Sequence, residues 1–281
     1  MRKTTGWNAA AEAAAYGDGH MILAQGKSVV EVDGVEIEMN VRGSGRKLLF
    51  LHPEIGFDRA GPALDALATG AQVIAPTHPH YGAAKAPATL NTVDDLSYLY
   101  LDLIEKLDLG ELAVVGLGIG GWIAAATAIK NDALFSRLVL VDAFGIKVGG
   151  REARDIFDMY FVTEADLAKV LYFDQELAAR DVSKLPDEEL YAIARAREAT
   201  SLYGWKPYLH DPKLKGRLHR IRVPTLVLWG ADDRIVAPDY GRAYCAAIPG
   251  ARFVAVERAG HFPHVEKPEE FAKHVLGFIG G

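Results

Sequence analysis

Short apolar runs recur along this chain, and helical patterns separate them. The runs are nearly continuous in apolar residues and cover residues 47–51, 72–75, 112–115, 137–141, 225–229 and 252–256. A strand with one exposed face alternates apolar and polar residues, whereas a strand covered on both faces does not, so these runs predict buried strands. Strands that alternate with helices indicate the α/β class, with a mainly parallel sheet and helices on both faces. Ligands of such sheets bind at the carboxyl ends of the strands.

Two segments lie before the first of these runs. Residues 29–39 alternate apolar and polar positions on either side of Asp33-Gly34. An Asp-Gly pair supplies the positive φ angles of a tight hairpin turn, so this segment predicts two antiparallel strands. Residues 1–26 are expected to form an N-terminal extension, in which the alanine-rich residues 9–15 favour a short helix.

Helical patterns occur both between the strands and in one long insertion. Residues 92–107 predict an amphipathic helix with Thr92 as its N-cap. Residues 146–212 contain helical patterns, notably at 163–173 and 186–203, and no run typical of a strand. This segment is rich in aromatic residues and is expected to form a helical cap over the sheet. Its aromatic side chains either pack as an ordinary core or line an apolar pocket.

The composition excludes several classes of protein. The 281 residues are 50% hydrophobic, and 31 basic against 37 acidic residues give a net charge of −6 without a basic patch, which argues against a nucleic-acid surface. The single cysteine, Cys245, excludes a disulfide framework and a zinc site built from thiolates. No apolar run approaches the roughly 20 residues of a membrane-spanning helix, and residues 4–18 lack the apolar region of a secretory signal. We therefore expect a cytoplasmic globular protein that binds neither nucleic acid nor membrane.

The most distinctive local motif is a glycine-rich turn between a predicted strand and a predicted helix at 123–130. Gly116, Gly118 and Gly121 match the pattern G-x-G-x-x-G, and Asp142 follows Gly121 by 21 residues. In dinucleotide-binding proteins such glycines admit a pyrophosphate to the helix N-terminus, and the acidic residue binds the ribose. A dinucleotide-binding protein is therefore one interpretation of this turn.

Four other segments favour a different interpretation. They are residues 51–53 (Leu-His-Pro), 75–82 (ending His-Tyr-Gly), 228–236 (Leu-Trp-Gly-Ala-Asp-Asp-Arg-Ile-Val) and 259–268 (Ala-Gly-His-Phe-Pro-His-Val-Glu-Lys-Pro). With these segments in this order, the chain resembles the α/β-hydrolase fold family from about residue 29 to residue 279. The resemblance implies a mostly parallel, eight-stranded sheet with helices on both faces and an inserted helical cap. It divides the chain into a core of residues 27–145 and 213–281 and a cap of residues 146–212.

The resemblance also assigns roles to particular residues. It implies that Asp233 is the acid and His261 the base of a catalytic pair, while Asp142 is a second candidate for the acid or else a strand-end hydrogen-bonding residue. His52, Glu54 and Ile119 are expected at the oxyanion site or the pocket. Two histidines in one loop, at positions 78 and 80, are too few for a metal site. No metal and no cofactor is expected.

Gly118 departs from the family pattern. By the resemblance, residues 116–120 are the nucleophile elbow, G-x-S-x-G, with Gly118 in the serine position. The elbow strains a residue that carries a Cβ atom by about 1–3 kcal/mol, and glycine avoids this strain. Gly118 therefore preserves the turn, removes the nucleophile and leaves room for a water molecule. The other serines and Cys245 lie away from a strand-turn-helix corner.

Pro53-Glu54 is a second departure, because the family usually has glycine after the histidine of this loop. An ionised side chain at Glu54 is unfavourable beside an anionic intermediate. Glu54 therefore binds a polar substrate group, acts as an acid, or is simply a solvated loop carboxylate. We include Glu54 among the candidate catalytic residues.

These residues favour an enzyme that acts on a small, largely apolar ester, lactone or C–C substrate. In this hypothesis His261, oriented by Asp233, activates water or the substrate directly, because the elbow lacks a nucleophile. Three alternatives stay open: a catalytically degenerate ligand-binding protein of the same fold, a serine hydrolase whose elbow serine was replaced by glycine, and, with less support, the dinucleotide-binding protein. The expected partner is a small molecule, and the oligomeric state, with a homodimer among the options, is left open.

Overall fold

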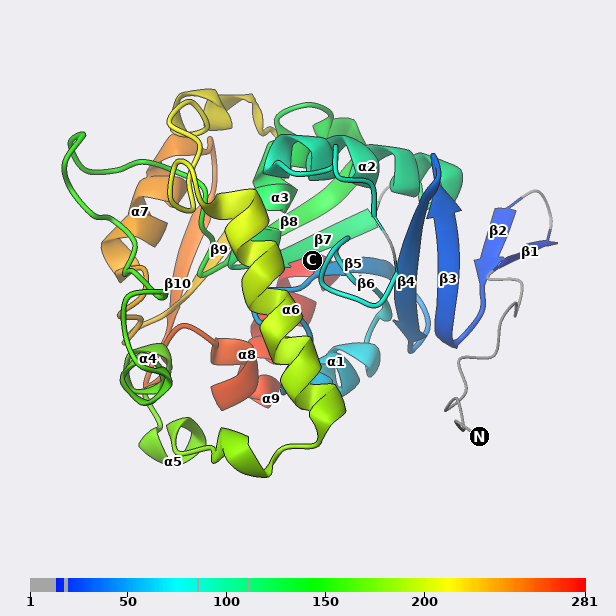
Figure 1. Ribbon diagram of the computed structural model, residues 1–281. Helices are drawn as coiled ribbons and strands as arrows, with labels where there is room; N and C mark the ends of the chain where they lie inside the picture. The colour runs from blue at the N-terminus through cyan, green and yellow to red at the C-terminus, as the bar shows by residue number, and fades with distance from the viewer. Residues whose placement is uncertain (1–13, 18–19, 85, 111) are drawn as a thin grey trace, which may run out of the picture.

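A central eight-stranded sheet organises the molecule (Figure 1). The computed structural model describes residues 14–17, 20–84, 86–110 and 112–281. The strands are β3 (Gly26–Val32), β4 (Val35–Arg42), β5 (Lys47–Leu51), β6 (Gln72–Pro76), β7 (Leu112–Leu117), β8 (Phe135–Val141), β9 (Thr225–Gly230) and β10 (Arg252–Val256). They lie in the order β10-β9-β8-β7-β5-β6-β4-β3. Strand β4 pairs antiparallel with both of its neighbours, and the remaining pairs are parallel.

The six apolar runs are the six parallel strands, so this prediction from the sequence is confirmed. Every residue of β7 and β9 is buried, as expected for strands covered on both faces. The predicted hairpin is confirmed as β3 and β4, where buried and more exposed positions alternate. Its turn contains Asp33 at φ 48° and Gly34 at φ 79°, the positive angles of a two-residue hairpin turn.

Helices cover both faces of the sheet. On one face, helices α1 (Gly61–Ala68) and α9 (Pro268–Gly280) pack against the side chains of Leu48 and Phe50. On the other face, Leu49 and Leu51 point into a core shared with helices α2 (Val93–Lys106), α3 (Ile119–Ala128) and α7 (Pro238–Ala247). Successive residues of β5 thus supply opposite cores, because side chains alternate along a strand. Because its side chains pack into both cores, strand β5 holds the loop at its carboxyl end in a fixed position.

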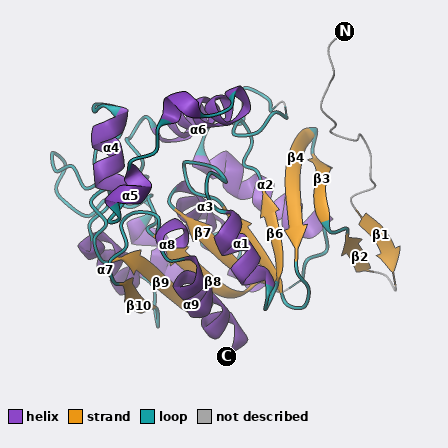
Figure 2. Ribbon diagram, turned by 90° about the horizontal axis from the view of Figure 1, so that it is seen from below, coloured by secondary structure: helices purple, strands orange, loops and turns teal. Residues whose placement is uncertain are grey.

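A helical segment is inserted between β8 and β9. It contains α4 (Glu164–Leu171), α5 (Gln175–Ala178) and α6 (Asp187–Gly204), and Figure 2 shows α6 on the opposite side of the molecule from α9. The chain leaves and re-enters the sheet domain at one place. There the N–H of Gly145 donates to the carbonyl of Leu209 at 3.0 Å, and the N–H of Asp211 donates to the carbonyl of Gly145 at 2.9 Å. These bonds close the insertion at its base.

Local signals in the sequence explain where two of the helices begin. Thr92 caps α2 as predicted: its hydroxyl accepts from the N–H of Asp95, and the Asp95 carboxylate accepts from the N–H of Thr92. Helix α3 begins at Ile119, four residues before the predicted start at 123, because the turn at Gly118 leads directly into the first helical turn. Among the described residues, no helix has the length and apolar character needed to cross a membrane.

The short helix expected at residues 9–15 is wrong where the structure can be compared. Residues 9–13 lie outside the described residues, and Ala14 and Ala15 belong to strand β1 (Ala14–Gly17). This strand pairs antiparallel with β2 (His20–Leu23), so its backbone groups bond to a neighbouring strand instead of within a helix. Alanine's helix propensity is a weak preference that such pairing overrides.

Candidate active site

The turn between β7 and α3 places Gly118 at the carboxyl end of the sheet. Gly118 has φ 50° and ψ −117°, its N–H donates to the carbonyl of Val141 at 3.0 Å, and its own carbonyl accepts from the N–H of Phe144 at 3.0 Å. This left-handed conformation is strained for a residue with a Cβ atom and accessible to glycine. The turn is therefore sharp and tied to the neighbouring strand β8.

Close backbone packing accounts for the other glycines of this motif. A Cβ atom on Gly116 would lie 2.4 Å from the carbonyl oxygen of Gly120, and one on Gly120 would lie 2.3 Å from that of Leu51. These contacts let β7, α3 and β5 approach one another more closely than side chains permit. The glycines are thus explained by packing within the protein, without a bound pyrophosphate.

The space above Gly118 is filled by the side chain of Glu54. A Cβ atom on residue 118 would lie 2.1 Å from Oε2 of Glu54. A water molecule therefore does not fit there, contrary to the expectation from the sequence. Glu54 is 6% exposed, which also corrects the alternative that it is a solvated loop carboxylate. A dinucleotide's pyrophosphate would meet this carboxylate at the N-terminus of α3, so the site opposes the dinucleotide-binding interpretation.

His261 and Asp233 lie on the loops after β10 and β9 and contact each other. Nδ1 of His261 donates to Oδ2 of Asp233 at 2.8 Å, and the other oxygen of Asp233 accepts from the N–H groups of Ile235 and Val236 at 2.8 and 3.0 Å. The imidazole stacks on Phe144, with ring centroids 5.2 Å apart and planes 20° apart. Asp233 thereby fixes the tautomer and the orientation of the imidazole.

The second ring nitrogen of His261 faces Glu54. The distance from Nε2 to Oε1 of Glu54 is 3.1 Å, and both side chains are almost completely buried. The contact is an ion pair when the imidazole is protonated. Neither oxygen of Glu54 has a well-aligned hydrogen-bond partner among the described residues. His261 therefore lies between two carboxylates, one on each ring nitrogen.

These two carboxylates control the charge of His261. Burial alone would lower the pKa of the imidazole, but the negative charges of Asp233 and then Glu54 outweigh burial and raise it well above the ordinary value of 6.5. His261 is consequently protonated at neutral pH in this arrangement. In this state it can act as an acid, and it becomes a base only after it has lost the proton.

Asp142, the alternative acid, lies beside this pair without taking the place of Asp233. It follows β8 at φ 43°, and its Oδ1 accepts from the N–H of Gly230 at 2.8 Å. Burial and then the charge of Asp233 raise the pKa of Asp142 well above its usual range, so this carboxyl group is neutral. Asp142, Asp233 and His261 bring one ligand atom each within 4.8 Å of one another. Nδ1 of His261 donates a hydrogen bond to Asp233. This bond explains why the ligand atoms lie close together without a metal ion.

His52 supports the loop that carries Glu54. Its Nδ1 donates to the carbonyl of Pro53 at 2.8 Å, and its Nε2 accepts from the N–H of His78 at 2.9 Å. His78 in turn bonds the hydroxyl of Tyr100 and the carbonyl of His52. Burial lowers the pKa of His52 to about 4, so the ring is neutral. Both nitrogens of His52 are thus used inside the protein, which gives it a positioning role.

Ile119 and the cap complete the surroundings of Glu54. Ile119 is the first residue of α3, where backbone N–H groups have no partner within the helix. From α6, the hydroxyl of Thr200 donates to the backbone carbonyl of Glu54 at 3.2 Å and bonds the hydroxyl of Tyr81 at 2.7 Å. The N–H of His261 donates to the carbonyl of Leu171, at the end of α4. The inserted segment therefore holds both loops of the site.

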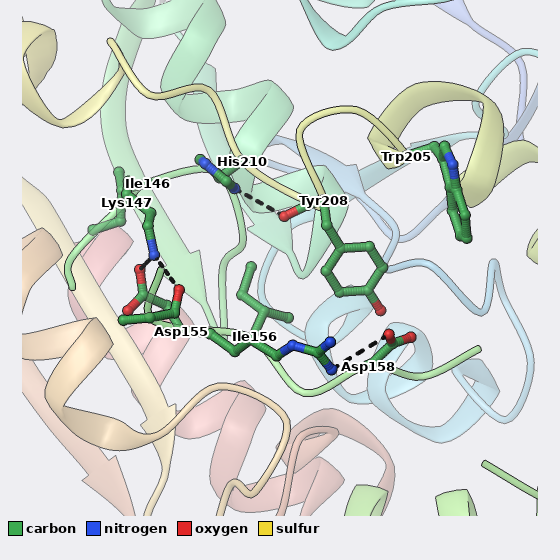
Figure 3. A pocket seen from close by; sticks show the side chains of 10 residues that line it. Ile146, Lys147, Asp155, Ile156, Asp158, Trp205, Tyr208 and His210 are labelled. Atoms are coloured by element: carbon green, nitrogen blue, oxygen red, sulfur yellow. Dashed lines mark hydrogen bonds and ion pairs between the residues drawn. The ribbon is translucent and has the colours of Figure 1, made fainter. Parts of the chain in front are cut away.

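Three of the cavities formed by the described residues lie beside the inserted segment, and none of these three is lined by Gly118, Glu54 or His261. One of about 370 Å³, shown in Figure 3, lies between residues 146–158 and 205–210. Its charged side chains pair with each other: Lys147 with Asp155 at 2.9 Å, and Arg154 with Asp158 at 3.8 Å. A second, of about 410 Å³, shares part of this lining. A third, of about 540 Å³, lies between residues 55–59 and α6.

The third cavity lies nearest to Glu54 along the chain, because Ile55, the residue after Glu54, lines it. Three of its charged residues pair with one another, since Arg180 binds Asp58 at 2.7 Å and Glu189 at 2.6 Å. The fourth, Arg59, donates to the carbonyl of Leu177 at 2.7 Å. Glu54 and His261 are 6% and 2% exposed. Both side chains are therefore shielded from solvent in this conformation.

Comparison with known proteins agrees with this architecture. A sequence model of the alpha/beta hydrolase family matches residues 48–274, and the chain belongs to this family. A 2-hydroxy-6-oxononadienedioate/2-hydroxy-6-oxononatrienedioate hydrolase from Burkholderia vietnamiensis is 27% identical over 279 residues, which cover 90% of this chain and 94% of that protein. The uncharacterized hydrolase YugF from Bacillus subtilis is 25% identical and covers 88% of this chain and 96% of its own length.

Solved structures share the fold. A mutant of the meta-cleavage product hydrolase CumD superposes with a TM-score of 0.74 at 19% identity, covering 90% of this chain and 97% of its own. The esterase EaEST from Exiguobacterium antarcticum gives a TM-score of 0.69 at 18% identity, covering 92% and 100%. The α/β-hydrolase fold expected from the sequence is thereby confirmed.

The residues named from the sequence fall into two groups. The structure brings together Gly118, Glu54, His261 and Asp233, with Ile119 next to Gly118 in the chain. His52 lies behind the loop instead of facing the site. Sequence reasoning missed the carboxylate above Gly118. A signal was present, however, because the unusual Pro53-Glu54 follows β5, the strand next to β7 and the elbow.

Proposed function

We propose that this protein is a serine-independent enzyme that hydrolyses small, largely apolar ester, lactone or C–C substrates with Glu54, His261 and Asp233. The observation that carries the proposal is the position of Glu54. Its Oε2 lies 2.1 Å from the place of a Cβ atom on residue 118, and its Oε1 lies 3.1 Å from Nε2 of His261. In a serine hydrolase the serine hydroxyl has the corresponding relationship to the histidine. A carboxylate here takes the place of that hydroxyl.

His261 is the proton carrier in this proposal. When protonated, it gives the Nε2 proton to the leaving group, and when neutral, it accepts a proton from water. Asp233 stabilises the imidazolium through Nδ1 and is itself held by two backbone N–H groups. General acid-base catalysis of this kind contributes roughly 10²- to 10⁴-fold to a rate.

Negative charge that develops on the substrate has a favourable neighbour in helix α3. The helix starts at Ile119, immediately after Gly118, and its N-terminal N–H groups and dipole stabilise an anion. This arrangement suits a tetrahedral intermediate of ester or lactone cleavage. The relatives named as 2-hydroxy-6-oxononadienedioate/2-hydroxy-6-oxononatrienedioate hydrolases support the inclusion of C–C substrates.

A substrate panel with three variants tests the proposal. Esters, lactones and C–C substrates are assayed with the wild type, His261→Ala, Glu54→Gln and Asp233→Asn. We expect turnover by the wild type and a loss of at least about 10²-fold in each of the first two variants. The control is Glu152→Gln, whose side chain is 94% exposed. Undiminished turnover by His261→Ala contradicts the mechanism.

The same panel separates this proposal from a ligand-binding role. Thermal stabilisation of the wild type by a compound that yields no product indicates binding without turnover. Product formation at a rate that depends on Glu54 indicates the enzyme. Absence of product from every class of substrate overturns the proposed function.

A further inference from the structure

One atom of the candidate active site takes no part in the proton transfers proposed above. This atom is Oε2 of Glu54. Oε1 contacts Nε2 of His261, whereas Oε2 is buried above the elbow and has no hydrogen-bond partner among the described residues. An unpaired carboxylate oxygen in a buried site is costly, so its position calls for a function. Oε2 lies at the N-terminus of α3, where an attacking oxygen and a developing anion are both stabilised.

Space at the elbow argues against an intervening water molecule. A base that activates water needs that water between itself and the substrate carbon. Oε2 already occupies the position in which a serine at residue 118 would place its side chain, because only 2.1 Å separates it from the Cβ position. The oxygen available for attack at this place is therefore the carboxylate oxygen itself.

We propose that Glu54 is a covalent nucleophile whose Oε2 attacks the acyl carbon of the substrate, and that the preferred substrates are aryl or enol esters and lactones. This inference rests on the proposed hydrolytic function and deepens it. Carboxylates act as nucleophiles in other enzyme classes, where they form covalent intermediates. The structure assigns this role to a residue on the loop after β5, outside the elbow.

The reaction has two balanced steps. In the first, Oε2 bonds to the acyl carbon of an ester R–CO–OR′, the bond from that carbon to OR′ breaks, and His261 gives its Nε2 proton to the leaving oxygen. The products are R′OH, neutral His261 and a mixed anhydride of Glu54 with the acyl group. In the second, water that gives a proton to Nε2 adds to Cδ of Glu54, and the bond from Cδ to the bridging oxygen breaks, so the oxygen of the water stays on Glu54 and the released acid takes Oε2. This step restores the Glu54 carboxylate and protonated His261 and releases the acid RCOOH.

The substrate preference follows from the weakness of a carboxylate as a base. Carboxylic acids have an ordinary pKa of about 4 and phenols of about 10, whereas alkyl alcohols are far weaker acids. A carboxylate therefore expels a phenolate or an enolate much more readily than an alkoxide. We expect kcat to fall by at least about 10²-fold from p-nitrophenyl butyrate to ethyl butyrate, since the first step limits turnover for poor leaving groups.

The first measurement traps the acyl group on Glu54. In His261→Gln, p-nitrophenolate leaves without needing a proton, whereas water is no longer activated. We expect a burst of one equivalent of nitrophenolate and an added butyryl mass on Glu54, which is the only glutamate in tryptic peptide 48–59. Glu54→Gln/His261→Gln is the matched control and should give neither signal.

The second measurement uses the wild type and so does not depend on the folding of a variant. Turnover of p-nitrophenyl butyrate in H₂¹⁸O, followed by rapid acid quenching, should give heavy oxygen or a butyryl group on Glu54. Direct attack of water on the substrate labels the product acid alone.

The outcomes separate this inference from the proposed function. If the wild type turns over the substrate but neither measurement finds ¹⁸O or a butyryl group on Glu54, the covalent role is overturned. The hydrolytic function then stays intact. Acylation of Glu54 without turnover supports the covalent role and overturns the hydrolytic function. Neither turnover nor acylation overturns both.

Discussion

Oε2 of Glu54 lies 2.1 Å from the position that a Cβ atom on Gly118 would take, so a side chain at residue 118 and Glu54 in its present position exclude each other. The two residues are distant in sequence and come from neighbouring strands, β5 and β7. Glycine is thus favoured at residue 118 both by the left-handed backbone and by the present position of Glu54. The glycine at residue 118 and the glutamate on the loop after β5 therefore form one structural unit.

The first prediction concerns the exchange of these two residues. Gly118→Ser should be inactive and destabilised, because the new side chain collides with Oε2 and strains the turn by about 1–3 kcal/mol. Gly118→Ser/Glu54→Ala removes the collision and places a serine hydroxyl beside His261, so it should gain an acylable serine. Labelling with a fluorophosphonate probe measures this gain. Labelling of Gly118→Ser alone, at the level of the double variant, contradicts the mutual exclusion.

The second prediction concerns the protonation of His261. Glu54→Gln removes one of the two negative charges that raise the pKa of His261, so the imidazole should titrate at lower pH in this variant. Titration of the ring proton resonances by NMR measures the shift, with Glu152→Gln as the exposed control. Equal midpoints in wild type and Glu54→Gln would show that the ion pair does not control the charge.

The ion pair also has a defined effect on stability. The folded pKa of His261 is raised, so its contribution to the unfolding free energy is complete below the ordinary value of 6.5 and is lost as the pH rises through the folded pKa. The stability difference between wild type and Glu54→Gln should therefore change in favour of the variant in alkaline solution. Denaturant titrations at several pH values measure it.

The third prediction concerns the neutral carboxyl group of Asp142. Asp142→Asn keeps an acceptor for the N–H of Gly230, whereas Asp142→Ala leaves that buried N–H unpaired, at a cost of about 1–3 kcal/mol. The raised pKa of Asp142 means that the folded state retains a proton that the unfolded chain loses above the ordinary carboxyl pKa. Wild-type stability should therefore decline relative to Asp142→Asn as the pH rises from 5 to 8. A gap that is constant with pH, measured by chemical denaturation, contradicts a neutral Asp142.

The fourth prediction concerns the buried His264. Neither of its ring nitrogens has a hydrogen-bond partner among the described residues, and it packs edge-on against Phe262 and Phe271. Burial and then the charge of His261 lower the pKa of His264 to about 3. Between pH 6.5 and 3 the unfolded chain binds a proton at this residue and the folded protein does not, so stability falls as the pH falls.

Substitution isolates this contribution. His264→Leu should lose less stability than the wild type when the pH is lowered from 7 to 5, because the residue that takes up the proton in the unfolded chain is gone. Denaturant midpoints at the two pH values measure the difference, and exposed His219→Gln is the control. An unchanged pH dependence in His264→Leu contradicts the lowered pKa.

The sequence alone predicted the sheet well, because a strand buried on both faces consists of consecutive apolar residues. The fully buried β7 and β9 read as unbroken apolar runs, and Asp33-Gly34 marked the hairpin. The pairing of Asp233 with His261 was also foreseen, through family resemblance, and the two side chains lie 2.8 Å apart. Features that depend on a few neighbouring residues, or on motifs of the family, could therefore be predicted from the sequence.

The arrangement of Glu54 could not be predicted in the same way. Its side-chain position depends on His52 and His78 behind the loop and on Thr200 from the inserted helices, 146 residues away in sequence. A loop carboxylate is exposed by default, and only the three-dimensional packing of these groups buries it. The neutral state of Asp142 likewise depends on its closeness to Asp233, which the sequence does not state.

The collision between residue 118 and Glu54 makes two oxygens alternatives at one place. A glutamate at residue 54 cannot take its present position while any side chain remains at residue 118. Because Oε2 is the end of a flexible side chain, a serine at the elbow and a glutamate at residue 54 can be present together only when the carboxylate is turned away from the elbow. A serine-dependent and a carboxylate-dependent form of this site are therefore mutually exclusive arrangements of the same loop.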